Sequence, residues 1–363
     1  MFRHGERIDR RTVSPFLSRV GPGVLLLLAF GSLWLPARGV TPARASVPAG
    51  LRRVRIGLVF DVGGRGDKSF NDGAWEGLER ARRELGAEVE YVEPGDADDR
   101  ASALRLFAAR GFDRVIGIGY IFSRDVDEVA RDYPGVRFAC VDYATPERGA
   151  VLPNTVGLVF REEEGAYLVG AAAALEARGA PVGFVGGMDI PLIRKFEAGY
   201  RAGVAAVCPH CRVFSGYAGS TPQAFKDPER GAALATTQFA NGARVIFHAA
   251  GSTGLGVFSA AERVGRMAIG VDADQYDEAP RVVLTSLRKR IDVVVFNVVR
   301  DAAREVFDRG DGGLRSFGLR EEGVDWVHQG PHARHLSAET VARVEGLRDA
   351  IVRGAVRVPT ELR

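Results

Sequence analysis

The chain has 363 residues, of which 46% are hydrophobic and 26% charged, and its formal net charge is +3. This composition predicts a globular protein of about two domains and excludes a low-complexity or disordered chain. The basic residues are scattered among acids and form no stripe or tail, so we expect no nucleic-acid partner.

The first 45 residues predict a signal peptide for export rather than part of the fold. A cationic start, "MFRHGERIDRRTV", precedes the apolar run "GVLLLLAFGSLWLP", and "ARA" at residues 43–45 fits a cleavage site of small residues. The apolar run is shorter than the roughly 20 residues that span a bilayer, although a retained membrane anchor is the alternative. No cysteine precedes Cys140. We therefore predict cleavage near Ala45 and Ser46, and a periplasmic protein without a lipid anchor.

From Val54 onward, short strand-like runs alternate with stretches of helical spacing, such as Ala74, Leu78, Ala81 and Leu85. The strand-like runs are "VRIGLVFDV", "AEVEYVEP", "RVIGIGY", "RFACVDY", "TVGLVF", "PVGFVGGM", "CRVFSGYAG", "RVIFHAAG", "MAIGVDAD" and "RVVLTSL". Such alternation predicts parallel sheets covered by helices on both faces, an α/β fold. So many strands exceed one comfortable open sheet, so we predict two sheets and two lobes.

Ligands of open α/β sheets bind beyond the carboxyl ends of the strands, so binding residues are expected at the strand-to-helix turns. The first is "DKSFNDGAW", residues 67–75. Ser69, with Asp72 three residues later, is a variant of the capping box and places the helix start at Phe70. Phe70 is then either a ligand contact at the crevice or a core residue, and its position alone leaves both open. The preceding "GGRGDKS" nearly matches a phosphate-binding loop, but Asp67 would set a carboxylate against the phosphate.

The second turn is "AAGSTGLG", where Gly251, Gly254 and Gly256 follow a strand and Asp272 ends the next one. This looks like a dinucleotide fingerprint, but the spacing is G-x-x-G-x-G rather than G-x-G-x-x-G. The pattern favours close approach of the backbone to a ligand, with an acid that accepts hydrogen bonds from a ribose-like diol.

Two further turns carry single candidates. In "GGMDIPLIRKFEAGY", Phe196 is a ligand candidate or, four residues before Tyr200, a core residue. In "LTSLRKRID", Lys289 on its own is typical of a solvated surface lysine. No catalytic constellation appears in the sequence. Gly330 and Pro331 break any helix that would align the histidines of "HQGPHARH", so we predict no metal site. A final amphipathic helix is predicted after Ser337.

The pair Cys208 and Cys211 in "CPHC" predicts a local disulfide in an oxidising compartment. The alternative is the redox motif of a thiol–disulfide oxidoreductase. That chemistry needs its first thiol at a helix N-terminus, and here the pair follows a helical stretch and precedes a strand-like run. We therefore favour a structural disulfide.

Taken together, "DKSFND.AW", "GMDIPLIRKFEAGY", "GSTGLGVFSAA", "GVDADQ" and "LTSLRKRID" resemble the basic membrane protein (BMP) family. These are purine nucleoside-binding proteins of bacterial ABC transporters, and the similarity runs from Val54 to "VRVPTEL". The resemblance implies a type I periplasmic binding protein: two Rossmann-like lobes with parallel sheets, joined by a three-segment hinge. The expected parts are a signal peptide at 1–45, lobe 1 at 46–160 and 286–325, and lobe 2 at 161–285 and 326–363.

The resemblance also implies roles for the candidate residues around a base. Phe70 and Phe196 match the family positions that sandwich the purine, and stacking is worth roughly 1–3 kcal/mol per base. Asn71 would offer an amide to the edge of the base. Where some relatives carry an acid that helps to recognise the base, this chain has Ser-Arg-Asp at residues 123–125.

Around the sugar, Asp272 and Lys289 match the ribose-binding pair, and Gly251 gives close backbone contact. We expect this acid and this amine to lie near each other and to keep each other ionised.

The function implied is that of a monomeric, non-enzymatic periplasmic protein without a cofactor. It would capture a purine nucleoside and deliver it to an inner-membrane ABC permease driven by an ATPase. Two alternatives remain: a nicotinamide- or nucleotide-dependent enzyme built on "GSTGLG", and a sensor that presents its ligand-bound form to a membrane receptor.

Overall fold

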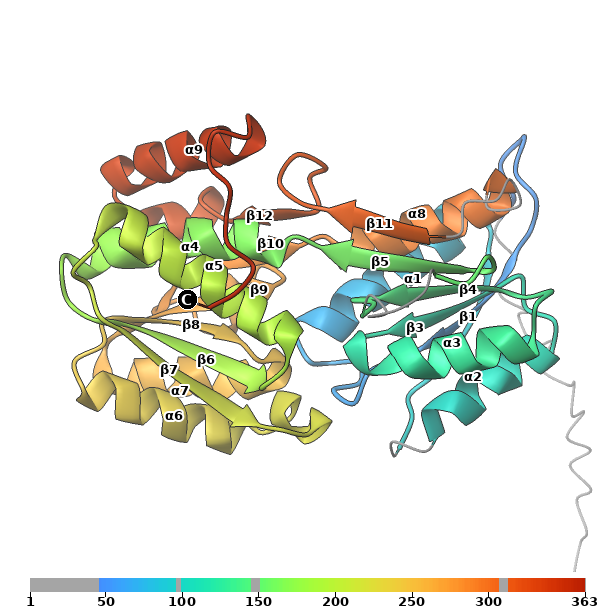
Figure 1. Cartoon of the computed structure of the whole chain (residues 1–363), viewed down its shortest axis with the longest axis horizontal. Coiled ribbons are helices and arrows are strands. Elements are labelled where there is room, and N and C mark those ends of the chain that lie inside the picture. The colour runs from blue at the N-terminus through green and yellow to red at the C-terminus, as the bar shows by residue number, and fades with distance from the viewer. Residues whose placement is uncertain (1–45, 96–98, 145–150, 307–312, 363) are drawn as a thin grey trace, which may run out of the picture. The chain divides into compact units, whose positions relative to one another are not determined.

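The computed structural model describes residues 46–362 apart from 96–98, 145–150 and 307–312, so the predicted signal peptide lies outside the described residues. The described residues fall within one compact unit. They form two six-stranded sheets, each placed between layers of helices, as Figure 1 shows. The predicted α/β fold with two sheets is confirmed.

The first sheet is parallel throughout. Its strands, in spatial order, are β11 (Gly313–Phe317), β5 (Thr155–Phe160), β4 (Arg137–Val141), β3 (Arg114–Ile118), β1 (Arg55–Val59) and β2 (Glu88–Val92). Two pairs of helices cover its faces: α1 (Phe70–Leu85) with α8 (Ile291–Ala303), and α2 (Asp99–Ala109) with α3 (Ser123–Asp132).

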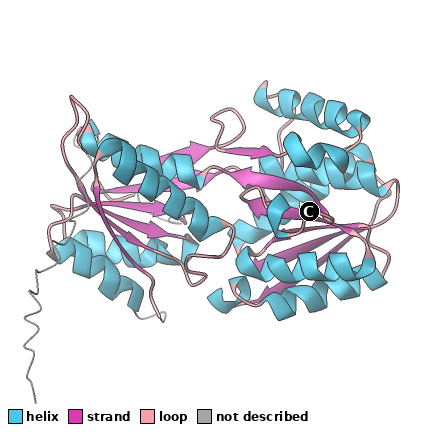
Figure 2. Cartoon of the chain, turned by 180° about the vertical axis from the view of Figure 1, so that it is seen from behind, coloured by secondary structure: helices cyan, strands magenta, loops and turns pink. Residues whose placement is uncertain are grey.

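The second sheet is parallel except for its short edge strand β12, which pairs antiparallel with β10. Its strands, in spatial order, are β12 (Val324–Trp326), β10 (Val283–Lys289), β9 (Met267–Asp272), β8 (Val245–Ala249), β6 (Val182–Met188) and β7 (Val213–Gly219). One face carries α4 (Glu162–Ala177) and α5 (Pro191–Val207), with α9 (Ala338–Val352) against α4, and the other carries α6 (Pro228–Ala240) and α7 (Gly254–Val264). The view from behind in Figure 2 shows the same layers.

The core follows from the patterns of the sequence. The strands β3 and β8 are buried along their whole length, as expected of parallel strands covered on both faces. The predicted stripe on α1 is confirmed, because its residues at helical spacing, Ala74, Leu78, Ala81 and Leu85, are all buried. Within the described ranges, no helix combines the length and the apolar character that crossing a bilayer requires.

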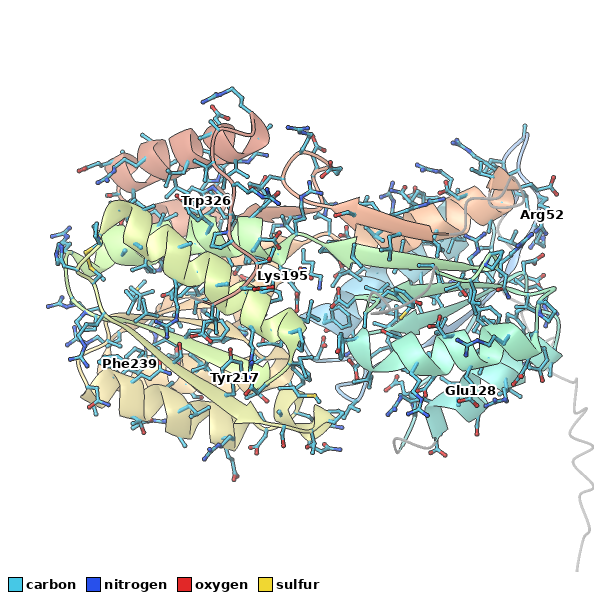
Figure 3. All side chains as sticks on the ribbon, viewed as in Figure 1. Arg52, Glu128, Lys195, Tyr217, Phe239 and Trp326 are labelled. Carbon is cyan, nitrogen blue, oxygen red and sulfur yellow. A yellow bond between two sulfur atoms is a disulfide. The ribbon has the colours of Figure 1, made fainter. Side chains whose placement is uncertain are left out.

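All ten predicted strand-like runs contain strands, but β11 and β12 were missed. β11 is a partly exposed edge strand of mixed character, and β12 has three residues, so neither has a strong hydrophobic pattern. β12 is held by tertiary contacts instead: Trp326 Nε1 donates a hydrogen bond of 2.8 Å to Glu345 of α9 (Figure 3).

The chain crosses between the two sheets three times in its described part: between β5 and α4, between β10 and α8, and between β11 and β12. This agrees with a three-segment hinge. The predicted lobe boundaries at 285/286 and 325/326 would divide β10 and β12, which both belong to the second sheet. We therefore propose crossings at residues 161, 290 and 318–323. We use lobe 1 for the part around the first sheet and lobe 2 for the part around the second.

Cys208 and Cys211 are joined in a disulfide directly after α5. Cys208 lies at the C-terminal end of that helix, where the helix dipole disfavours a thiolate. This position does not favour the oxidoreductase alternative. Among the described side chains, one group of three possible metal ligands lies within 4.8 Å, formed by this pair and His210, and both sulfurs are used in the disulfide.

We predict that replacing both Cys208 and Cys211 by serine lowers the free energy of unfolding by about 2 kcal/mol, because the closed loop is short. Ligand affinity should not change, because neither cysteine lines the cavity described below. Urea unfolding and calorimetric titration measure the two quantities. A loss of ligand binding in a folded variant would contradict a purely structural role.

Candidate functional site

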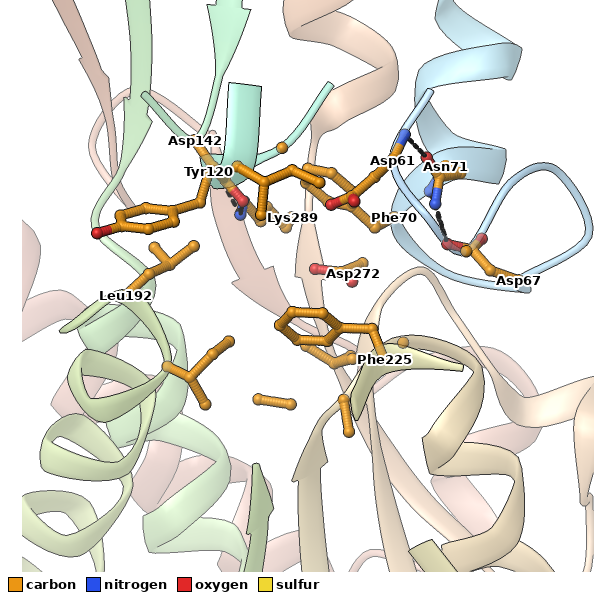
Figure 4. Close-up of a pocket in the computed structure, with 18 of the residues that line it drawn as sticks. Asp61, Asp67, Phe70, Asn71, Tyr120, Asp142, Leu192, Phe225, Asp272 and Lys289 are labelled. Atoms are coloured by element: carbon orange, nitrogen blue, oxygen red, sulfur yellow. Dashed lines mark hydrogen bonds and ion pairs between the residues drawn. The ribbon is translucent and has the colours of Figure 1, made fainter. Parts of the chain in front are cut away.

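A cavity lies where the carboxyl ends of the strands of both sheets face each other (Figure 4). From lobe 1 it is lined by the turns after β1, β3 and β4, and from lobe 2 by the segments after β6, β7 and β8 and by the ends of β9 and β10. This is the expected place for a ligand in open α/β sheets. The lining is largely apolar, with a small set of acids and one lysine, as in pockets that orient a small molecule.

The structure brings all the sequence-predicted binding residues to this cavity. They come from five separate segments of the chain, and they are Phe70, Asn71, Phe196, Gly251, Asp272 and Lys289. The acid at Asp125, in the turn where some relatives carry an acid for the base, does not line the cavity and is paired with Arg100 at 2.8 Å.

Aromatic rings reach the cavity from both lobes. Phe70 is the first residue of α1 in lobe 1, and Phe196 lies in α5 of lobe 2. The Lys289 ammonium lies 5.1 Å from the ring centre of Phe70 and 5.9 Å from that of Phe196, so both rings surround the same charge. A third ring, Phe225, was missed by the sequence reasoning. It follows β7 in a short 3₁₀ turn with no strand-to-helix signal, and Figure 4 shows its ring within the cavity.

The start of α1 is at Phe70, as predicted, but its predicted cap is wrong. The Asp67 carboxylate, not the Ser69 hydroxyl, accepts from the free backbone N–H groups, at 3.0 Å from Ser69, 2.9 Å from Asn71 and 3.2 Å from Asp72. The Asp72 carboxylate accepts hydrogen bonds from the backbone N–H groups of Gly66 and Lys68 in the preceding loop. One carboxylate therefore satisfies several helix-start donors, and the Ser69 side chain is free for another partner.

That partner is Asp272, whose Oδ2 accepts a hydrogen bond of 2.6 Å from Ser69 Oγ. The bond connects lobe 1 to lobe 2. Burial raises the pKa of Asp272 to about 6, although Lys289 and the Ser69 hydroxyl both favour the ionised form. Lys289 therefore favours the ionised acid, as expected, but does not fully offset burial: Asp272 is an acceptor above a pH of about 6 and becomes neutral below it.

Lys289 is not a surface lysine. Its buried Nζ lies 2.6 and 2.7 Å from the carboxylate oxygens of Asp142 and 3.2 Å from Glu162, and Glu162 also pairs with Lys195 at 2.5 Å (Figure 3). Burial disfavours the charged ammonium, but the two carboxylates outweigh it and raise the pKa of Lys289. The direct partners of Lys289 are thus Asp142 and Glu162 rather than Asp272. No local signal in the sequence marked either acid.

Two acids of the cavity have left-handed backbones, with φ of 58° at Asp142 and 65° at Asp272. Residues other than glycine adopt this conformation uncommonly, although aspartate tolerates it better than most. Such positions concentrate at functional sites, where the surrounding fold holds them in place. Here the fold fixes two carboxylates toward one cavity.

The glycines of "GSTGLG" divide into two kinds. Gly251 has a φ of 54° and lines the cavity. A Cβ at Gly254 would lie 2.0 Å from the His248 ring, and one at Gly256 would lie 1.8 Å from the carbonyl oxygen of Pro228. The last two glycines therefore allow α7 to pack against β8 and α6 and do not face the cavity.

Comparisons with known proteins identify the family that the chain matches. The family model described as ABC transporter substrate-binding protein PnrA-like (Bmp) matches residues 54–361. The chain is 37% identical over 290 residues to an uncharacterised lipoprotein of Pyrococcus horikoshii, covering 76% of this chain and 69% of that protein. It is 29% identical over 339 residues to basic membrane protein A of Borreliella burgdorferi, covering 93% and 95%.

Among solved structures, an ABC transporter system solute-binding protein of Aeropyrum pernix superposes with a TM-score of 0.75 at 30% identity, covering 84% of this chain and 94% of that one. The predicted type I periplasmic binding fold is thereby confirmed. The lipoprotein name of the Pyrococcus relative weighs against the expectation that the mature protein carries no lipid anchor.

Proposed function

Because the chain belongs to the PnrA-like (Bmp) family of ABC transporter substrate-binding proteins, we propose that it captures a purine nucleoside in the cavity between its lobes. We further propose that it acts as a monomer in the periplasm, without catalysis, and delivers the nucleoside to an inner-membrane permease powered by an ATPase. Whether it is released or anchored, a protein on the periplasmic side of the inner membrane can bind the nucleoside before the nucleoside reaches the permease.

The observation that supports this proposal is the meeting of two phenylalanine rings from different lobes, Phe70 and Phe196, in one cavity with a polar end. A flat heterocycle offers two faces for stacking, and each aromatic contact contributes roughly 1–3 kcal/mol per base. The acid Asp272 lies at the same cavity and can accept hydrogen bonds from two sugar hydroxyls when ionised. A purine nucleoside therefore suits both the aromatic part of the cavity, which would stack on its base, and the acidic part, which would bind its ribose.

Contacts between the lobes suggest how binding is linked to closure. The bond from Ser69 to Asp272 is one such contact. In addition, the Gln275 side chain donates a hydrogen bond of 2.9 Å to the carbonyl oxygen of Lys68, and the Lys68 ammonium lies 3.9 Å from the Glu278 carboxylate. These bonds can form only when the lobes are together. A ligand that contacts both walls favours the closed form and shifts an existing open–closed equilibrium.

The enzyme alternative is less well supported by the same structure. Gly254 and Gly256 are needed for packing of α7, so their presence does not indicate a dinucleotide. The sensor alternative uses the same cavity and the same closure, and it differs only in the membrane partner. Uptake of labelled nucleoside by cells with and without the gene separates the sensor from the transport protein.

A thermal-shift panel with adenosine, guanosine, inosine and NAD tests the proposed function. A ligand present at about 1,000 times its dissociation constant adds about 4 kcal/mol to the free energy of unfolding. We expect at least one nucleoside to raise the melting temperature and NAD to leave it unchanged. If NAD alone raises it, the transport proposal fails and the enzyme takes its place.

A further inference from the structure

The motif "GVDADQ" ends in Gln275, a residue of lobe 2 that follows β9 and is 1% exposed. Gln275 is not among the described residues that line the cavity, so the proposed binding of a nucleoside gives it no direct role. A buried side-chain amide makes its hydrogen bonds inside the protein. The partners of Gln275 therefore indicate what the residue does.

Within lobe 2, the Gln275 side chain is fixed against the end of β9. Its Oε1 accepts a hydrogen bond of 2.9 Å from the backbone N–H of Val271, and its own backbone N–H donates one of 3.1 Å to the Ser286 hydroxyl of β10. A Cβ at Gly270 would lie 2.8 Å from Oε1, so this glycine makes room for the side chain. The acceptor end of the amide is thus bound within lobe 2, which leaves the Nε2 donor for another partner.

The partner of Nε2 lies in lobe 1. Gln275 Nε2 donates a hydrogen bond of 2.9 Å to the carbonyl oxygen of Lys68. In the same peptide group, the N–H of Ser69 donates one of 3.0 Å to the Asp67 carboxylate. The N–H and C=O of a trans peptide point in opposite directions, so Asp67 directs the Lys68 carbonyl toward lobe 2. Lys68 also has a φ of 59°, a conformation uncommon outside glycine that concentrates at functional sites.

The neighbouring contacts between the lobes differ from this one. The ion pair of Lys68 with Glu278 is exposed to solvent, so it contributes little to closure. The bond from Ser69 to Asp272 involves an acid that lines the cavity, so its effect on closure cannot be separated from an effect on the ligand. Among these contacts, the bond from Gln275 is both buried on its donor side and independent of the cavity lining.

We propose that Gln275 is a positioning residue for ligand binding, which holds the lobes closed through the Lys68 carbonyl and so sets the affinity without touching the ligand. This inference rests on the proposed function and goes beyond it, because it names a residue outside the cavity that controls how tightly the ligand is held. When the lobes separate, Nε2 exchanges the Lys68 carbonyl for water, whereas the bond to Val271 stays within lobe 2. Only the bond between the lobes therefore enters the equilibrium between open and closed forms.

Replacing Gln275 by methionine removes the donor and keeps a side chain of similar length. One net hydrogen bond corresponds to a factor of about 2 to 12 in an equilibrium constant. We expect affinity to fall by about that factor for whichever of adenosine, guanosine and inosine gives the largest thermal shift, as measured by calorimetric titration. If the methionine variant does not fold, Gln275→Glu at pH 8 takes its place, because it keeps the acceptor for Val271 and, when ionised, offers no donor to Lys68.

The matched control is Gln238→Met. Gln238 is also buried, at 5% exposed, and its Nε2 donates a hydrogen bond of 2.8 Å to the carbonyl oxygen of Phe184 within lobe 2. Both variants lose a buried amide and its bond to a backbone carbonyl, but only Gln275→Met loses a bond between the lobes. Gln238→Met should therefore keep the wild-type affinity. Circular dichroism and thermal melting establish which variants fold.

The distance between the lobes is the readout that a purely structural role would not change. Spin labels at Ser102→Cys in α2 and Gln223→Cys after β7 report it, because these exposed positions lie near β2 and β7, the sheet edges farthest from the hinge. In the ligand-free protein, pulsed electron resonance should find long distances more often in Gln275→Met than in wild type. With saturating nucleoside, both proteins should reach the same short distance.

These measurements separate the possible failures. Unchanged affinity in folded Gln275→Met would overturn the inference. A fall in affinity with the ligand-free distances of wild type would also overturn it, because Gln275 would then act on the cavity wall at Val271 rather than on closure. If no purine nucleoside binds the wild-type protein, the proposed function fails, and the ligand-free distances still decide whether Gln275 holds the lobes together.

Discussion

Replacing Phe70 by alanine should weaken nucleoside binding by about 5- to 150-fold, the loss that corresponds to roughly 1–3 kcal/mol of stacking. The ring lines the cavity and is only partly buried, so its removal should change the contact with the base more than the core. Phe196 is less suitable for this test. It is 3% exposed and packs against Phe247, so its truncation would also cost the free energy of a core cavity.

The matched control for this experiment is Phe214→Ala in β7. Phe214 is also partly buried, but it packs on the face of the second sheet that α6 and α7 cover, and it does not line the cavity. Titration of both variants with the nucleoside that gives the largest thermal shift compares their affinities. Unchanged affinity in folded Phe70→Ala would mean that Phe70 is only a core residue, and the sandwich of two rings would have to be abandoned.

Replacing Lys289 by methionine should lower the free energy of unfolding by about 3–5 kcal/mol at pH 8, because it leaves the buried carboxylates of Asp142 and Glu162 without their shared cation. The loss should shrink at pH 5. An unpaired buried carboxylate has its pKa raised in the folded state, so it takes up a proton and the folded variant recovers stability as the pH falls. Urea unfolding at the two pH values measures this.

Two further variants make the Lys289 experiment specific. Adding Asp142→Asn to Lys289→Met removes one of the stranded charges and should recover part of the loss, because the two positions share one interaction. Asparagine also tolerates the left-handed backbone found at Asp142. Lys226→Met, at an exposed position, should change stability by less than about 0.5 kcal/mol. A loss for Lys289→Met as small as that of Lys226→Met would show that the ion pair is not buried in solution.

Several of the candidate residues illustrate how far local patterns go. The position of Phe70 at a strand-to-helix turn placed it at the crevice edge, yet the same position suited a core residue, because a pattern of neighbours cannot say which face of a turn is open. The family resemblance indicated the cavity residues from Phe70 to Lys289, and the structure places all of them at one cavity. Their roles as ligand contacts remain the prediction that the variants above test.

Other features depended on partners that are distant in the chain. Lys289 was indistinguishable from a surface lysine, because its partner Asp142 is 147 residues away. No local sequence pattern marked Phe225 as a binding residue. Its loop after β7 becomes part of the cavity wall only because it packs against the end of β6, at Gly187. The predicted cap at Ser69 was wrong because Asp272, from the other lobe, takes its hydroxyl and Asp67 satisfies the helix start instead.

The sequence by itself determined the alternation of strands and helices, the division into two sheets and the turns at which a ligand could bind. These follow from hydrophobic periodicity and turn chemistry, which act over a few neighbouring residues. Only the tertiary structure decided which acids pair with Lys289 and that both ends of the Asn71 amide are engaged within lobe 1. The reason is physical: burial and pairing set the charge and hydrogen-bonding capacity of a side chain, and both depend on which distant segments the fold brings together.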